Sequence, residues 1–158
     1  MVKGYLIDFD GVILDSQERF QDAMKDNTNY YDWMEYLSSL EWYNFLRECH
    51  QIDDSLTVLA KLQYLRKLKG IITAIHSFKE GEEKLIYLRE NNICVPVYYT
   101  LPHQKKSDVY IPNNRTILVD DNLKNCIDWE LSGGKSILFD RYYQGEEKGK
   151  IRTLKKLL

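Results

Sequence analysis

Short apolar runs alternate with amphipathic stretches along most of the chain. The apolar runs are too short for helices and rich in strand-forming residues, and they predict strands at residues 5–9, 71–75, 95–100, 116–119 and 136–139. The amphipathic stretches predict helices between these runs, over residues 54–68, 80–91 and 123–131, and a wholly helical segment between residues 15 and 54. This alternation is typical of an α/β fold with helices on both faces of a parallel sheet.

Proline and the rules of chain winding predict the order of the strands. Pro96 lacks an N–H group for a sheet ladder, so the strand that contains it belongs at an edge. If the second and third strands wind off one side of the first, and the fourth and fifth off the other, the order is 3-2-1-4-5. We therefore expect a doubly wound, five-stranded parallel sheet whose ligand site lies where the first and fourth strands end.

Two further helix predictions depend on particular residues. The apolar spacing that begins near Ser55 continues through Leu65 and Leu68, and Gly70 then provides a C-terminal stop. Residues 148–158 combine basic positions with regularly spaced Ile and Leu residues. This tail predicts an amphipathic terminal helix whose basic face is solvated.

Four carboxylates follow the two strands that meet at the predicted ligand site. Asp8 and Asp10 come at the end of the first strand, and Asp120 and Asp121 come at the end of the fourth. Because these groups repel one another at short range, their convergence calls for a cation. Hard oxygen ligands completed by water and phosphate suit Mg²⁺, and all four residues are candidate metal ligands.

The residues around these acids resemble a known family. Asp-Phe-Asp-Gly-Val-Ile-Leu-Asp-Ser at 8–16 and Ile-Leu-Val-Asp-Asp-Asn at 117–122 look like the first and fourth motifs of the haloacid dehalogenase-like (HAD) hydrolases. The resemblance implies that Asp8 is a nucleophile that forms an aspartyl-phosphate, and that Asp10 is the general acid and base. It thus implies a Mg²⁺-dependent phosphatase acting on phosphomonoesters.

The second and third motifs of the family are located only by their place in the strand order. Ser77, after the second strand, would hold a phosphoryl oxygen, although it also suits the cap of the following helix. Lys106 or Lys105 would neutralise the phosphate, and Lys106 is favoured because Ser107 and Asp108 suit a helix start. Which of the two acids of the fourth motif binds the metal directly stays open.

Residues 16–54 lie where part of the family inserts a small helical (C1-type) cap, so the predicted core consists of residues 1–15 and 55–158. This insertion holds 8 of the 20 aromatic residues, with 9 acids against 3 bases. Such a lid disfavours nucleic acid strands but suits a small monophosphate with a flat group to stack. Residues 120–135 loosely resemble the 5'-nucleotidase and deoxyribonucleotidase branch, which also favours a nucleotide.

Length and composition limit the alternatives. The 158 residues suit one ordinary domain with 44% hydrophobic and 29% charged residues, and no apolar run is long enough to span a membrane. Three widely spaced cysteines favour a reducing, cytoplasmic setting. A sugar-phosphate phosphatase, a polynucleotide end phosphatase and a non-catalytic phosphate-binding module stay open as alternative functions, and the oligomeric state is undetermined.

Overall fold

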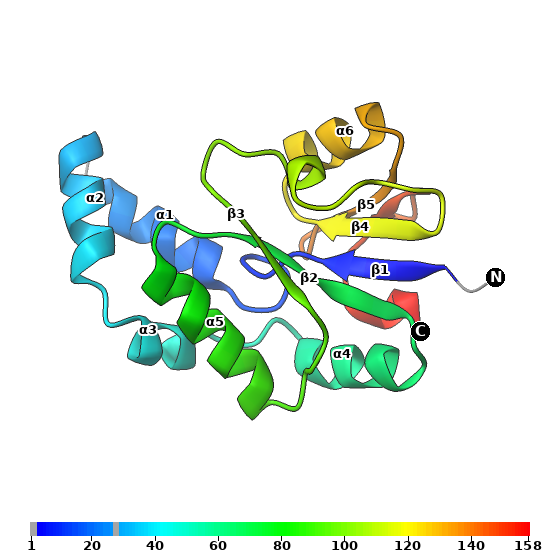
Figure 1. Cartoon of the computed structure of the whole chain (residues 1–158), viewed down its shortest axis with the longest axis horizontal. Helices are drawn as coiled ribbons and strands as arrows, with labels where there is room; N and C mark the ends of the chain where they lie inside the picture. The colour runs from blue at the N-terminus through cyan, green and yellow to red at the C-terminus, as the bar shows by residue number, and fades with distance from the viewer. Residues whose placement is uncertain (1–2, 27–28) are drawn as a thin grey trace.

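Among the residues that the structure describes, the sheet has six parallel strands, and its order matches the predicted order with one strand added. The computed structural model describes residues 3–26 and 29–158. The strands are β1 (Gly4–Ile7), β2 (Leu68–Ala74), β3 (Val97–Thr100), β4 (Thr116–Asp120), β5 (Lys135–Phe139) and β6 (Lys150–Ile151). Their order is β3-β2-β1-β4-β5-β6, so Pro96 immediately precedes an edge strand, as its chemistry predicts (Figure 1).

The described residues also form six α-helices and two 3-10 helices. They are α1 (Ser16–Asp26), α2 (Tyr30–Ser39), α3 (Trp42–Glu48), α4 (Ser55–Tyr64), α5 (Phe78–Glu90), α6 (Leu123–Leu131), η1 (Lys106–Asp108) and η2 (Leu154–Leu157). In the described ranges, no helix has both the length and the apolar character that a membrane crossing requires.

Neighbouring residues of each central strand face opposite sides of the sheet. Ile7 of β1 joins the large hydrophobic core, which α4, α5 and η2 cover, whereas Leu6 joins a smaller core beneath Trp129 of α6. Ile71 and Ile72 of β2 divide in the same way. Because strand side chains alternate, this burial on both faces explains why the runs are continuously apolar.

The C-terminal tail does not form the predicted terminal helix. Lys150 and Ile151 instead pair with Leu138 and Phe139 of β5, which extends the sheet to six strands. The next turn, η2, buries Leu154 and Leu157 against α4. Leu154 and Leu157 are buried, but the helical periodicity of the tail was misleading because Lys150 and Ile151 pair with the edge of the sheet.

The helix that precedes β2 ends earlier than its leucine spacing predicts. Arg66 adopts a left-handed conformation with φ 58°, and the Lys67 N–H donates to the carbonyl of Leu62, which closes α4. Leu68 is consequently the first residue of β2 instead of the last turn of the helix. Leu65 lies beyond the helical face and is 43% exposed.

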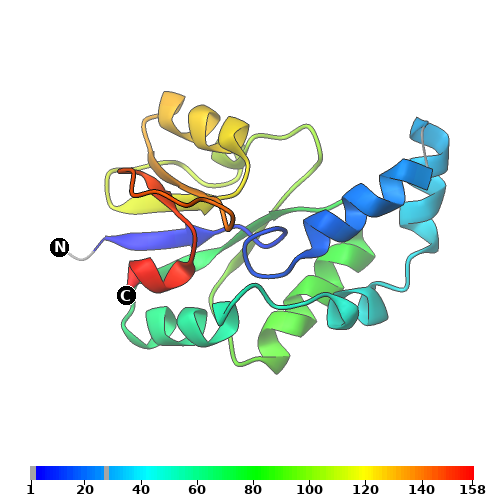
Figure 2. The ribbon, with the colours of Figure 1, turned by 180° about the vertical axis from the view of Figure 1, so that it is seen from behind.

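The helical insertion, residues 16–54, lies beyond the carboxyl ends of the strands, as Figures 1 and 2 show for α1, α2 and α3. Its buried residues Phe20, Trp42 and Leu46 belong to the same hydrophobic cluster as Ile7 of the sheet. The division into a core and a separate cap stays a prediction. Residues 1–2 of that core, and residues 27–28 of the insertion, lie outside the described residues.

The corrected end of α4 predicts different costs for two leucines that the sequence pattern treats alike. Leu59→Ala empties a fully buried site and is expected to lower the free energy of unfolding by about 2–5 kcal/mol. Leu65→Ala removes an exposed side chain and should change it by no more than about 0.5 kcal/mol. Urea denaturation of both variants measures the difference, and equal losses would contradict the observed end of the helix.

Candidate active site

Three carboxylates meet where β1 and β4 end. Ile7 is in register with Val119 on the neighbouring strand, and the Asp8 N–H donates to the Val119 carbonyl at 2.9 Å. This pairing places Asp8 beside Asp120 and Asp121, and ligand oxygens of the three side chains all lie within 4.8 Å of one another. Parallel strands thus bring together acids that are more than a hundred positions apart in the chain.

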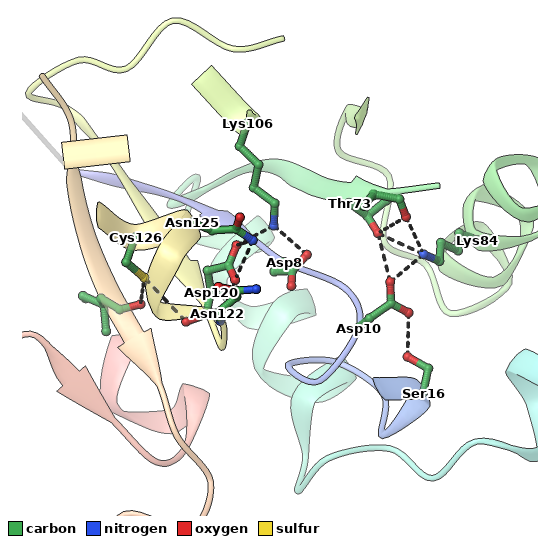
Figure 3. A network of polar contacts seen from close by, with 12 residues as sticks. Asp8, Asp10, Ser16, Thr73, Lys84, Lys106, Asp120, Asn122, Asn125 and Cys126 are labelled. Atoms are coloured by element: carbon green, nitrogen blue, oxygen red, sulfur yellow. Dashed lines mark hydrogen bonds and ion pairs between the residues drawn. The ribbon is translucent and has the colours of Figure 1, made fainter. Parts of the chain in front are cut away.

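Lys106 provides a positive charge at the centre of this acidic cluster. Its Nζ lies 2.7 Å from Asp8 Oδ1 and 2.5 Å from Asp120 Oδ2 (Figure 3). Burial acts to lower the pKa of Lys106, but the two carboxylates outweigh burial and raise that pKa. The ammonium group therefore stays charged, and it joins the two strand ends through one buried ion-pair network.

Asp120 is held by several donors, whereas Asp121 faces a cavity. Besides Lys106, the carboxylate of Asp120 accepts hydrogen bonds from the Asn122 N–H at 2.8 Å and from Asn125 Nδ2 at 3.1 and 3.2 Å, and it is fully buried. Asp121 lines the cavity together with Asp8. Both acids of this motif belong to the group of three carboxylates that could hold a metal ion, and Asp121 is the one that lines the cavity.

The donor set fits a divalent cation. Burial, partly offset by Lys106 and reinforced by Asp120 and Asp121, raises the pKa of Asp8. Burial and the neighbouring Asp120 raise the pKa of Asp121 to about 7. Carboxylates this destabilised in their charged form gain most from an added cation, and oxygen ligands suit Mg²⁺.

A glycine allows this close approach. Gly11 has φ 77°, a conformation that favours glycine, and a Cβ at this position would overlap the Asp121 carboxylate. The turn after β1 can therefore bring Asp10 and Gly11 against the loop after β4. The presence of glycine at position 11 of the first motif is therefore explained by steric contact with Asp121, which the sequence pattern alone does not reveal.

The carboxylate of Asp10 points away from the acidic cluster, as Figure 3 shows. Its Oδ1 accepts a hydrogen bond from Ser16 Oγ at 2.6 Å, and its Oδ2 lies 2.6 Å from Lys84 Nζ. Asp10 still lines the same cavity as Asp8. Its carboxylate is not part of the group of three acids that could hold a metal ion, because a buried ammonium group of α5 binds it, and Asp10 as a metal ligand stays a prediction.

Two other predicted site residues lie outside the cavity. Ser77 is exposed at the N-terminus of α5, where its Oγ accepts a hydrogen bond from the Glu80 N–H at 3.1 Å. Ser77 caps α5, whereas Ala74 of β2 lines the cavity, and the phosphate-binding role of Ser77 stays a prediction. Lys105 is also exposed and pairs with Asp128 at 3.9 Å, so Lys106 is the lysine that reaches Asp8.

The cavity has a volume of about 460 Å³ and a mainly polar lining. Its residues are Asp8, Asp10, Gln17, Gln21, Ala74, Lys106, Asp121, Asn122, Leu123 and Asn125. The acids and the lysine occupy the strand ends, whereas Gln17 and Gln21, one turn apart on α1, contribute amide groups from the helical insertion. No aromatic side chain of the described residues is part of this lining.

Sequence reasoning missed several of these residues. Gln17, Gln21 and Asn125 follow the two acidic motifs at helical spacing, and this spacing was a usable signal once helices were expected there. Ser16 closes the first motif itself. Lys84 had no such signal, because it lies in the middle of a predicted helix, 74 positions from the aspartate that it binds.

Comparisons with known proteins agree with this architecture. No protein-family model and no curated protein matches the sequence. Among solved structures, a HAD hydrolase of family IA, variant 3, from Entamoeba histolytica HM-1:IMSS is similar, with TM-score 0.61 and 14% identity over 98% of this chain and 95% of that chain. The chain has a HAD-like fold.

A second solved structure supports the same HAD-like fold. A HAD-superfamily hydrolase from Ehrlichia chaffeensis has TM-score 0.55 and 11% identity, over 99% of this chain and 95% of that chain. At such identities the likeness concerns the fold alone. The C1-type cap and the nucleotidase branch stay predictions.

The raised pKa values predict how metal binding responds to pH. Without metal, folded Asp121 holds a proton up to about pH 7, whereas the unfolded chain releases it near its ordinary pKa of 3.8. The folded state binds more protons in this interval, so the stability of the metal-free protein falls as the pH rises from about 4 to about 7. Mg²⁺ should restore that stability above pH 7 by binding the ionised carboxylates.

Thermal unfolding at pH 5 and pH 7.5, with Mg²⁺ and with chelator, measures this effect. We expect Mg²⁺ to raise Tm by several degrees at pH 7.5 and by much less at pH 5, since 1 kcal/mol shifts the Tm of such a domain by about 2–4 °C. Asp121→Asn, which cannot ionise, is the matched control and should respond weakly at both values. The same response to Mg²⁺ at both pH values would contradict the assigned ligands.

Proposed function

We propose that the protein is a Mg²⁺-dependent hydrolase of small phosphate monoesters that works through an aspartyl-phosphate. The observation that carries the proposal is the meeting of Asp8, Lys106 and Asp121 in one cavity at the carboxyl ends of β1 and β4. This arrangement offers a nucleophile, a fixed cation and a metal ligand within reach of one phosphate group. The HAD-like fold of the two solved hydrolases supports the same reaction class.

In the first step, a carboxylate oxygen of Asp8 attacks the phosphorus atom. The P–O bond to the alcohol breaks, and its electron pair goes to the leaving oxygen, which takes a proton. Lys106 lies 2.7 Å from Asp8 Oδ1 and positions the nucleophile while it offsets negative charge on the phosphoryl oxygens. Mg²⁺, held by Asp8 and Asp121, would supply further charge neutralisation when bound.

Asp10 is the proposed proton donor for the leaving oxygen, because it lines the same cavity two residues after the nucleophile. In the second step, water attacks the phosphorus of the aspartyl-phosphate and gives a proton to Asp10, which restores the carboxylate of Asp8 and releases inorganic phosphate. Both steps require the Asp10 carboxyl group to contact the substrate. The contacts with Ser16 and Lys84 fix the position of this carboxyl group.

The lining of the cavity favours a polar, uncharged leaving group. Sequence composition favours a nucleotide stacked on the aromatic residues of the insertion, but none of the described rings lines this cavity, and several of them pack against one another. Trp33 stacks on Tyr36 at 5.4 Å, Phe20 stacks on Phe45 at 5.1 Å, and Tyr36 and Phe45 line a different cavity. The amides of Gln17 and Gln21 instead suit the hydroxyl groups of a sugar or polyol phosphate, and we propose this substrate class over nucleotides.

Assays with a panel of phosphate esters test the proposed function. The panel includes sugar phosphates, nucleoside monophosphates, a 5'-phosphorylated oligonucleotide and p-nitrophenyl phosphate, each with Mg²⁺ and with chelator. Release of phosphate that requires Mg²⁺ and prefers sugar phosphates supports the proposal, and a preference for nucleotides supports the sequence prediction instead. Tight phosphate binding without turnover of any ester would favour a non-catalytic module.

Asp8→Asn is expected to lower kcat by at least about 10³-fold, because the amide lacks the nucleophilic charge while keeping the shape of the side chain. Intact-protein mass spectrometry after rapid quenching should detect a phosphoryl adduct on the unaltered protein and none on this variant. Circular dichroism and Tm serve as controls for folding. Turnover close to normal in the folded variant would exclude the covalent mechanism.

Replacing both Gln17 and Gln21 with Leu should raise KM for a sugar phosphate by roughly 5- to 100-fold, the value of one to a few neutral hydrogen bonds. KM for acetyl phosphate, whose small acyl group does not extend along α1, should stay unchanged. Lys25→Gln alters an exposed residue of the same helix and is the matched control. Equal changes in KM for both substrates would argue against contact between these amides and the leaving group.

A further inference from the structure

Lys84 is a fully buried lysine of α5 whose ammonium group binds Asp10, one of the residues that line the cavity. Its Nζ lies 2.6 Å from Asp10 Oδ2 and 3.0 Å from both Thr73 Oγ1 and the Ala74 carbonyl. Figure 3 shows this group of contacts beside the cluster around Lys106. A buried charge is costly unless it is paired and hydrogen-bonded. The partner that pairs with Lys84 is Asp10, the residue proposed to transfer the proton.

A second carboxylate fixes Lys84 from behind. Glu80, one turn earlier on α5 and 1% exposed, places Oε1 2.8 Å from Lys84 Nζ. The other oxygen of Glu80 accepts the His76 N–H at 2.7 Å and lies 3.1 Å from His76 Nδ1. The ammonium group is thus anchored between two carboxylates and cannot turn away from Asp10 without losing a charged partner.

The two oxygens of Asp10 are held by different helices. Ser16, the first residue of α1, donates to Oδ1, and Lys84 of α5 binds Oδ2. One bond alone would let the carboxylate rotate about its own axis, whereas two bonds in different directions determine its plane. The carboxylate is therefore oriented by groups that come from the insertion and from the core.

We propose that Lys84, backed by Glu80, is a positioning residue that sets the orientation of Asp10 for proton transfer to the leaving group. This role rests on the proposed function, because it assigns Lys84 to the proton-transfer part of that reaction. Lys84 acts through Asp10 and does not touch the phosphate. Lys106 and Lys84 thus serve different aspartates, the first the nucleophile and the second the proton carrier.

Lys84→Met tests the role, since it keeps the length and burial of the side chain and removes the ammonium group. Loss of orientation at Asp10 should lower kcat by roughly 10- to 100-fold for an alkyl phosphate, whose leaving oxygen needs the proton, and leave KM nearly unchanged. With p-nitrophenyl phosphate, whose leaving group needs little protonation, kcat should fall by no more than about 3-fold. Asp10→Asn provides the reference and should show the same dependence on the leaving group.

Lys79→Met is the matched control, because Lys79 lies on the same helix, is largely exposed and pairs only with Glu82 and Glu83 in the described residues. It should leave both rates unchanged. If Lys84→Met does not fold, the double variant Lys84→Met/Glu80→Gln removes the uncompensated carboxylate, and the same dependence on the leaving group is expected. Equal losses for the two esters, or no loss, would overturn the positioning role.

A crystal structure of the folded Lys84 variant gives a readout that does not depend on turnover. The Asp10 carboxylate should leave its place against Ser16 Oγ, and an unchanged Asp10 would overturn the proposal. An unaltered protein that hydrolyses neither ester refutes the proposed function, but a shifted Asp10 would still support positioning by Lys84. The kinetic and structural outcomes therefore separate the two proposals.

Discussion

The ion pair between Lys106 and the two strand ends is the interaction on which the site depends. Asp8 and Asp120 are both buried, and their carboxylates repel each other at the distance that the register of β1 and β4 imposes. The Lys106 ammonium group lies 2.7 Å from Asp8 and 2.5 Å from Asp120, and its positive charge offsets the repulsion between the two carboxylates. Removing it would leave buried negative charge without a partner, which costs far more than an exposed ion pair contributes.

Buried lysines divide the acids of the site into two groups with different properties. Around Lys106, the acids outnumber the cation, so the pKa values of Asp8 and Asp121 are raised and the cluster suits a metal ion. Around Lys84, two carboxylates satisfy one ammonium group, and Asp10 is held by hydrogen bonds and an ion pair. Asp8 and Asp10, two residues apart in one short motif, therefore have different charged neighbours because their side chains point in different directions.

The helical insertion contributes to the site mainly through α1. The turn after β1 leads directly into this helix, so Ser16 can hold Asp10 while Gln17 and Gln21 face the cavity. Several aromatic residues of the insertion stabilise its packing instead of lining the cavity. Phe20, Trp42 and Phe45 pack against one another within the same hydrophobic cluster as the sheet, and this packing holds α1 in place above the strand ends.

The sequence by itself determined the parts of the protein that depend on local pattern. Continuous apolar runs identified five of the six strands, Pro96 identified an edge, and the acids at the strand ends identified the place of the site. It failed at the tail around Lys150 and Ile151, because a two-residue edge strand has no periodicity of its own. It also extended α4 through Leu68, because the leucine spacing continues past the left-handed turn at Arg66.

Only the tertiary structure decided which side chains meet. The choice of Lys106 over Lys105, the direction of the Asp10 carboxylate away from the acidic cluster, the capping position of Ser77 and the pairing of Asp10 with Lys84 all depend on directions in space. The crossover from β2 into α5 brings Asp10 and Lys84 together. The positions of these two residues in the sequence do not predict their contact. Chain pattern determines which face of an element is buried, whereas packing in three dimensions determines the partner of each charge.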